Sequence, residues 1–235
     1  MSVNSLFIDV STNLCSVLLQ KGTERVERLS SGRGIHSEDL FAHIQSVLAE
    51  AEISAGDISS IYLTAGPGSY TGLRIGASAV KGFVFGRKKT VSVYQMHTLP
   101  VFAIKAELAT STIHGVMNAR RKHLFYQEFN IDEEGVLRSN ADQAENLLIT
   151  DVEKVVQPGD IVVGTGIERL DETVRSVLTL DPIEELNTAV LMLRLLENQL
   201  KAFQNPEESP FIEKVEPETF EPYYYSPGHA QVQHS

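Results

Sequence analysis

This sequence of 235 residues has one cysteine, no tryptophan and no long apolar run, and the lack of cysteines and of long apolar runs each argues against a class of protein. The single cysteine, Cys15, cannot form an internal disulfide, which is consistent with a reducing compartment. No run of 18 apolar residues occurs, and the apolar stretch 6–19 is interrupted by Asp9 and Asn13. No Lys or Arg precedes that stretch, so we expect no signal peptide, no membrane span and a cytoplasmic location.

Acidic residues are absent between Asp57 and Glu107, although the whole chain has a net charge of −11. Residues 1–127 carry 13 basic and 9 acidic side chains, whereas residues 128–235 carry 7 and 22. The second half should therefore repel phosphate backbones. We therefore expect no nucleic-acid-binding surface that extends over the whole protein. Only the first half is expected to face an anion.

The first hundred residues show the pattern of three strands followed by alternating helices and strands. Ser37 stands at an N-cap position, with Glu38 and Asp39 in the first turn of a helix expected to end near Glu52. A glycine-rich turn at 66–72 leads into a second helix that ends near Phe85. The predicted strands cover 5–10, 15–20, 25–29, 60–65 and 90–94.

A weaker copy of this order follows, with a possible strand near Val136 and a helical stretch at 141–148. The other strands expected there cover 113–118, 124–130 and 160–164, and a last helix covers 186–203. The order is typical of the α/β, two-lobed actin-like (ribonuclease-H-like, ASKHA) ATPase fold with a degenerate second lobe, an analogy that does not give function. We expect an N-terminal lobe at 1–100, a smaller lobe at 101–204 whose last helix can pack back on the first, and an extended or partly disordered Pro/Glu-rich tail at 205–235.

The glycine-rich turn lies between a strand and a helix, where backbone N–H groups favour an anion. It fails as a Walker loop, because Leu73 and Arg74 follow Gly72 where Lys and Ser or Thr are required. It fails as a dinucleotide fingerprint, because its third glycine comes one residue late and no acid follows for the ribose. Ser69 lacks the flanking glycines of a serine-hydrolase elbow and is not predicted to be a nucleophile.

Small residues recur at helical spacing after this turn, and two interpretations stay open. The glycines at 72, 76, 82 and 86, with Ala79, either allow tight packing against the chain's own sheet or form a partner-docking face. Arg74 and Lys81 lie two turns apart and, with the basic run 87–89, form an acid-free patch. That patch is either a solvated face or a surface that meets acidic side chains or phosphate.

Several of these segments together resemble a known family. They are Phe7-Ile8-Asp9-Val10-Ser11-Thr12-Asn13-Leu14-Cys15-Ser16-Val17, His36-Ser37-Glu38, the block from Gly66 to Gly76, and Lys81-Gly82. The chain resembles the TsaB (YeaZ) family, the bacterial accessory subunits for threonylcarbamoyladenosine synthesis on tRNA, and the match is dense over 5–95. Beyond residue 100 the likeness thins: Asn118 stands where the family has the acid of Asp-Ala-Arg, and Tyr225 where it has the basic residue of Pro-x-Tyr-x-Arg.

The resemblance implies a non-catalytic scaffold that pairs with the catalytic subunit TsaD through helices of the N-terminal lobes, while the ATPase TsaE binds the pair. It implies tRNA contact only through the complex, a homodimer when TsaD is absent, and ATP or ADP only at the interface with TsaD or TsaE, with no tightly bound cofactor. We expect no catalytic residue and no metal ligand. The expected interface residues are His36, Ser37, Glu38, Phe41, Ser69, Tyr70, Thr71, Gly72, Arg74, Ile75, Gly76, Ala79, Lys81 and Arg120; Asp9, Ser11 and Thr12 are weak candidates for a nucleotide-proximal position.

The sequence agrees with an accessory role in two ways. TsaD carries a His-x-x-x-His metal pair, whereas no two histidines here stand four apart. The turn after Asp9 has no glycine, which limits the approach of backbone N–H groups to a phosphate. The rival functions are a free-standing actin-like ATPase or kinase and a glycoprotease-like peptidase.

Individual residues keep more than one interpretation. Asp9 is a relic of a metal-proximal acid or, as we predict, a strand-end carboxylate hydrogen-bonded to the residues that follow it. His36 and Glu38 can cap their helix and also face a partner. Arg120 either reaches the partner or flanks a strand, and Cys15 is predicted to be a buried strand residue rather than a reactive thiol.

Overall fold

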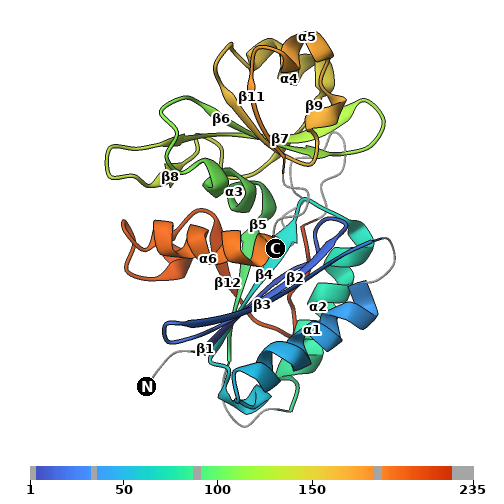
Figure 1. Ribbon diagram of the computed structural model, residues 1–235, viewed down its shortest axis with the longest axis vertical. Coiled ribbons are helices and arrows are strands. Elements are labelled where there is room, and N and C mark those ends of the chain that lie inside the picture. Colours follow the sequence, from blue (N-terminus) through green and yellow to red (C-terminus); the bar gives the residue numbers. More distant parts are fainter. Residues whose placement is uncertain (1–3, 33–35, 87–90, 183–186, 224–235) are drawn as a thin grey trace.

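The computed structural model describes residues 4–32, 36–86, 91–182 and 187–223. Two β-sheets lie one above the other, with helices between them and on the outer face of the first sheet (Figure 1). The chain builds most of the lower sheet, then the upper sheet, and returns to the lower one near its C-terminal end.

The first sheet has the strand order β12-β5-β4-β1-β2-β3. Its strands are β1 (Asn4–Asp9), β2 (Leu14–Lys21), β3 (Glu24–Ser31), β4 (Ser60–Gly66), β5 (Ser92–His97) and β12 (Ile212–Val215). The meander β1-β2-β3 is antiparallel, and β4 and β5 run parallel to β1. Because both faces of β1 are covered, it reads as a nearly continuous apolar run: Leu6 and Ile8 face one core and Phe7 the other.

The second sheet repeats this plan with shorter strands. Its members are β6 (Ile113–Asn118), β7 (His123–Ile131), β8 (Leu137–Arg138), β9 (Glu145–Leu148), β10 (Ile161–Gly164) and β11 (Thr179–Pro182). The order is β11-β10-β6-β7-β8, with β9 also paired to β7; β6 and β7 are antiparallel, and β10 and β11 run parallel to β6. A strand meander with parallel strands added on its other side, present twice, is the predicted actin-like fold with a degenerate second lobe.

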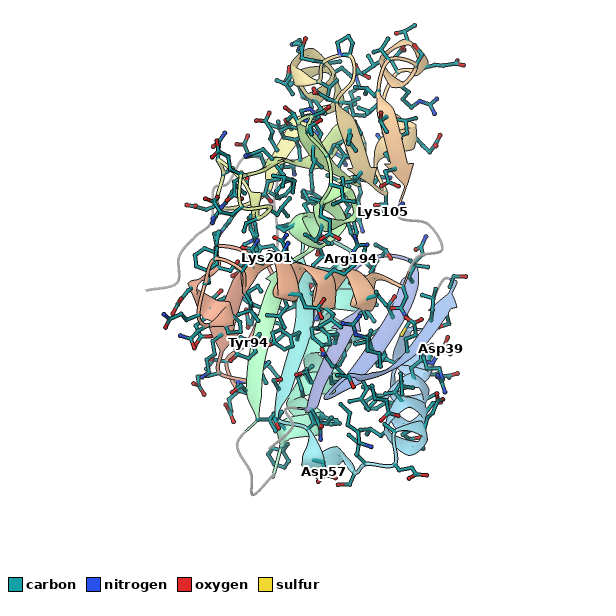
Figure 2. All side chains as sticks on the ribbon, turned by 60° about the vertical axis from the view of Figure 1, so that its left-hand side comes forward. Asp39, Asp57, Tyr94, Lys105, Arg194 and Lys201 are labelled. Atoms are coloured by element: carbon teal, nitrogen blue, oxygen red, sulfur yellow. The ribbon has the colours of Figure 1, made fainter. Side chains whose placement is uncertain are left out.

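The helices divide between the two faces of the first sheet. On the outer face, α1 (His36–Glu50) packs on β2 and β3, α2 (Tyr70–Val84) packs on β4, and the two helices contact each other. On the inner face, α6 (Thr188–Gln199) crosses β1 and β2, beside α3 (Thr98–Ala103), which also contacts the second sheet (Figures 1 and 2). The short helices α4 (Ile149–Val155) and α5 (Glu172–Arg175) belong to the second lobe.

One apolar core joins the two lobes. Phe7, Tyr62 and Tyr94 stack on neighbouring strands of the first sheet, with ring centroids 4.7 and 4.8 Å apart. They belong to the same buried cluster as Phe129 of the second sheet and Met192 of α6. At the edge of this junction, Arg194 lies 2.5 Å from Glu107, and Lys105 pairs with Asp181; Figure 2 labels both basic residues. The shared core explains why α6 lies against the first lobe.

Two local predictions are wrong, and hydrogen bonding explains the first. Residues 145–148 form strand β9 instead of part of a helix at 141–148, because they pair with β7 from Tyr126↔Glu145 to His123↔Leu148. The Ala141 carbonyl accepts a hydrogen bond of 2.8 Å from Gln127 Nε2, which fixes the approach to the strand. Sheet pairing therefore overrides the helix propensity of this segment. The short helix that does form starts at Ile149.

The predicted tail at 205–235 is the second error, because the described residues up to 223 belong to the first lobe. Strand β12 pairs antiparallel with β5, Phe211 and Phe220 are buried, and the Tyr223 N–H donates to the Ala65 carbonyl over 2.8 Å. β12 is an edge strand of the first sheet, and the prolines of this segment lie outside it, so none of them removes a hydrogen bond from the strand pair. Residues 224–235 lie outside the described residues.

Smaller differences concern element boundaries. Helix α1 begins at His36, so Ser37 lies within its first turn and is not its N-cap. Strand β5 starts at Ser92, while the predicted start at Thr90 lies outside the described residues; so does Leu186, the predicted start of the last helix. The strand expected near Val136 is the two-residue β8, and β11 was not predicted.

Candidate functional site

Helix α2 begins at the end of the glycine-rich turn, where Ser69 is its N-cap. The Ser69 Oγ accepts a hydrogen bond of 3.2 Å from the Gly72 N–H. The Ser69 N–H in turn donates to the Ser11 carbonyl over 2.6 Å. Two backbone donors at this helix end are thus already used within the protein, and the turn joins α2 to the β1–β2 connection.

The small residues of α2 were open to two interpretations, packing against the chain's own sheet or docking a partner. The structure decides between them at Gly72 and Gly76. A Cβ on Gly72 would lie 2.1 Å from the Val10 carbonyl oxygen, and a Cβ on Gly76 would lie 2.8 Å from Val10 Cγ2. Both were expected at the partner interface, but both face the chain's own strand, so for them the packing interpretation is correct. At Gly82, by contrast, an added Cβ would meet nothing within 4 Å.

The outer side of α2 and the neighbouring face of α1 form a shallow hollow of roughly 480 Å³. Phe41 of α1 is 55% exposed and Tyr70 of α2 is 53% exposed. The hollow is lined by Phe41, Tyr70, Thr71, Arg74, Ile75, Ser78 and Ala79. Two large aromatic side chains left in water around an apolar depression are typical of an interaction surface. We call these seven residues the α1/α2 hollow.

Arg74 is oriented by its neighbour within the hollow. Its Nη1 donates a hydrogen bond of 2.7 Å to the Tyr70 hydroxyl, and its guanidinium carbon lies 5.4 Å from the Tyr70 ring centroid. The pair, four residues apart on α2, holds a cation at the rim of the hollow. An acidic or aromatic side chain of a partner would meet a charge that is already in place.

The other predicted interface residues are only partly gathered here. Glu38 is exposed in the first turn of α1, and Lys81 is half-buried in the last turn of α2. The side chains of His36 and Ser37 lie outside the described part. Arg120 belongs to the turn between β6 and β7 in the second sheet, whereas α1 and α2 cover the outer face of the first (Figure 1).

Asp9 ends β1 and is completely buried, with its carboxylate oxygens engaged by the protein. Its Oδ1 accepts a hydrogen bond of 2.9 Å from the Ser11 N–H and another from the Thr64 hydroxyl. Its Oδ2 accepts from the Thr188 hydroxyl of α6. Thr12 is used locally, its Oγ1 accepting from the Leu14 N–H over 3.0 Å. The predicted strand-end hydrogen bond to Ser11 is confirmed, and the carboxylate also accepts from Thr64 and Thr188, which the sequence did not indicate.

A second hollow, of roughly 500 Å³, lies beside β5 and β12 and includes Asp142 of the second lobe. His97 lines it and is only 5% exposed, and this burial lowers its pKa to about 4 against the opposing effect of Glu213. Gln95 Nε2 and the Tyr223 hydroxyl both donate to Glu213 Oε2. Sequence patterns carry no sign of this polar cluster, because the segment holding Glu213 and Tyr223 has the composition of a tail.

Neither a metal cluster nor a membrane helix is found in the part of the chain that the structure describes. In residues 4–32, 36–86, 91–182 and 187–223, no three His, Cys, Asp or Glu side chains come together as a metal site. Within the same ranges, no helix is long and apolar enough to cross a membrane. Cys15 is buried in β2, as predicted.

The duplicated sheets and the shared core define an actin-like protein. A family model described as TsaD, tRNA N6-adenosine threonylcarbamoyltransferase, matches residues 33–169. The tRNA threonylcarbamoyladenosine biosynthesis protein TsaB of Escherichia coli is 29% identical over 141 residues, covering 59% of this chain and 60% of its own length. The TsaB protein of Bacillus subtilis is 27% identical over 176 residues, covering 74% of this chain and 69% of its own. The chain belongs to this threonylcarbamoyltransferase family, on its TsaB (YeaZ) branch.

A solved structure agrees on the fold. YeaZ from Pseudomonas aeruginosa superposes with a TM-score of 0.74 at 23% identity, over 95% of this chain and 100% of that chain. The aligned segment spans only about 60% of the E. coli relative's length.

Proposed function

We propose that this chain is a non-catalytic subunit of the machinery that makes N6-threonylcarbamoyladenosine on tRNA, and that it docks on TsaD through the α1/α2 hollow. The observation that carries the proposal is the hollow itself, where exposed Phe41 and Tyr70 surround an apolar floor with a fixed cation at the rim. The TsaB names of its relatives supply the process. TsaE is the further partner in this proposal, and the cytoplasm is its location.

The lack of a catalytic role is supported by how the candidate groups are used. Asp9, the acid that an actin-like kinase would need near phosphate, is buried and has hydrogen bonds on both carboxylate oxygens. The backbone donors of Ser69 and Gly72 at the start of α2 are occupied as well. A nucleotide would therefore be held mainly by TsaD or TsaE, and tRNA would be modified by the complex.

The same hollow should find a second copy of this chain when TsaD is absent. Exposed aromatic side chains around an apolar floor favour burial against an identical surface related by a two-fold axis. In this proposal the homodimer and the heterodimer are alternatives, since they use one face. Adding TsaD to the free chain should then dissociate the homodimer.

Docking can be tested by size-exclusion chromatography and calorimetry with purified TsaD. Phe41→Asp and Ser78→Arg place charge at exposed positions of the hollow without disturbing the lobe's own core. We expect both to weaken the heterodimer at least tenfold, about 1.4 kcal/mol or more. Leu108→Asp is the matched control, because Leu108 is 93% exposed and lies outside the hollow.

The outcome decides between the proposal and its rivals. Unchanged TsaD binding by both hollow variants would remove the α1/α2 face from the proposal. Nucleoside mass spectrometry of tRNA incubated with TsaD, TsaE and their substrates should show product only when this chain is present, and none with this chain alone. Micromolar ATP binding by the isolated chain would favour the actin-like ATPase, and cleavage of casein above a buffer control would favour the peptidase.

A further inference from the structure

The turn between β6 and β7 carries three consecutive cations, Arg120, Arg121 and Lys122, all exposed. Among the described residues, eight other lysine and arginine side chains form ion pairs with carboxylates. In the same part of the chain, the side chains of the three turn residues form no ion pair or hydrogen bond with the protein. The turn is therefore a local concentration of positive charge without an ion-pair partner among the described residues.

The backbone of this turn is held in an unusual shape. Arg120 has φ 73° and Arg121 has φ 50°, in the left-handed backbone region that residues other than glycine rarely adopt. The Asn118 Oδ1 accepts a hydrogen bond of 2.9 Å from the Arg120 N–H and one of 2.5 Å from Arg169 Nη1. Arg169 Nη2 also donates to the Arg121 carbonyl. Arg169, a fourth cation, thus holds the backbone of the turn by hydrogen bonds, while the other three cationic side chains are exposed to solvent.

Among the described residues, the acids that flank Arg169 in the sequence form no ion pair with the turn. Glu168, which precedes Arg169, pairs with Arg175 over 3.1 Å. Asp171 is occupied as well, capping α5 by accepting from the Thr173 N–H over 2.9 Å. The protein thus holds four like charges together at one turn, at an electrostatic cost that a bound anion would relieve.

We propose that this turn, which we call the Arg120–Lys122 turn, binds phosphates of an RNA backbone, so that the chain touches tRNA directly; the choice of RNA rests on the function proposed above. The three cations sit on an open turn, and none of them lines either hollow described above, which fits an extended polyanion better than an enclosed nucleotide. The three side chains are all cationic and include no apolar group, whereas the centre of a protein interface is depleted in charge. Phosphate contacts of this kind position RNA without reading its sequence.

The test compares two double variants of equal charge. Arg121→Gln/Lys122→Gln removes two turn cations, and Lys201→Gln/Lys214→Gln removes two exposed cations elsewhere. Binding of a fluorescein-labelled, unmodified tRNA transcript to the full chain is measured by anisotropy over a range of KCl concentrations. We expect the turn variant to bind on the order of tenfold more weakly at low salt. Its slope of log K against log salt should fall by about one for each phosphate that the variant no longer neutralises. The control should match the wild type.

Each alternative has its own signature. No binding by the wild-type chain at low salt, or equal losses in the two variants, would overturn the proposal. Binding of poly-L-glutamate as tight as that of tRNA, with the same loss in the turn variant, would assign the turn to an acidic protein instead. Loss of ATP binding in the turn variant with tRNA binding intact would assign it to a nucleotide. Circular dichroism melting checks that both variants are folded.

RNA binding by the turn can fail without the proposed function failing. Docking on TsaD is measured without RNA and depends on the α1/α2 hollow. RNA binding is measured without TsaD and depends on the Arg120–Lys122 turn. A turn variant that still docks on TsaD but loses tRNA affinity would support both statements together.

Discussion

The hydroxyl of Thr188 donates a hydrogen bond to Oδ2 of Asp9, joining residues 179 positions apart in the chain. Thr188 is the first residue of α6 and Asp9 the last of β1, and both side chains are buried. The same hydroxyl lies 3.1 Å from Ser16 Oγ on β2. A helix from the C-terminal third is thereby attached to the strand-end acid of the first lobe.

This hydrogen bond predicts a measurable effect on stability. In Thr188→Val the buried Asp9 carboxylate loses one donor, which should lower the free energy of unfolding by about 1–3 kcal/mol. Thr179→Val is the control, since Thr179 is exposed, and should stay within about 0.5 kcal/mol of the wild type. Urea unfolding measures both. A Thr188→Val protein as stable as the control would mean that the Thr188–Asp9 hydrogen bond contributes nothing to the stability of the fold.

The glycines of α2 should respond in opposite directions to alanine. In Gly72→Ala the new methyl group meets the Val10 carbonyl at 2.1 Å, so strand and helix must separate, at a cost of about 1–3 kcal/mol or more. In Gly82→Ala the methyl group meets nothing within 4 Å, and helix propensity should stabilise the protein by up to about 1 kcal/mol. Thermal unfolding should show a lower Tm for the first variant and an unchanged or higher Tm for the second. Equal shifts would contradict the assigned packing.

His97 should make the protein less stable in mild acid. Burial lowers its pKa to about 4 in the folded state, whereas the unfolded chain takes up the proton near pH 6.5. The stabilisation is therefore complete above about pH 6.5, falls with decreasing pH, and is about 2 kcal/mol smaller at pH 5. In His97→Phe this part of the pH dependence should be missing. Urea unfolding at pH 7 and pH 5 makes the comparison, and equal losses in the two proteins would rule out His97 as the titrating group.

Cys15 should be inert in the folded protein. Burial is the main reason that its thiol pKa rises to about 12, with Asp39 and Asp9 adding to the effect, so hardly any thiolate exists at pH 8. Reaction with a disulfide reagent should be slow in buffer and rapid in urea, with one thiol titrated per chain. Leu108→Cys provides the contrast, because that position is 93% exposed and should react at once. Fast labelling of Cys15 in the native protein would show that β2 opens locally.

The sequence by itself determined the fold class and most of the elements, because its local signals agree with the tertiary arrangement. Apolar runs identified β1, β4 and β6, and the glycine-rich turn marked the start of α2. Residues Phe41, Tyr70 and Arg74 were expected at one surface and do lie around one hollow. That expectation came from the family resemblance, and docking of a partner at this hollow stays a prediction.

Only the tertiary structure decided the rest, because the deciding interactions join residues far apart in the chain. The glycines at 72 and 76 face Val10 and not a partner, which depends on how closely α2 approaches β1. Residues 145–148 became a strand because β7 offered hydrogen bonds, and residues 212–215 became one because β5 had a free edge. The Asp9–Thr188 bond and the burial of His97 likewise depend on where α6 and β12 return to the first sheet, and local sequence carries no record of that return.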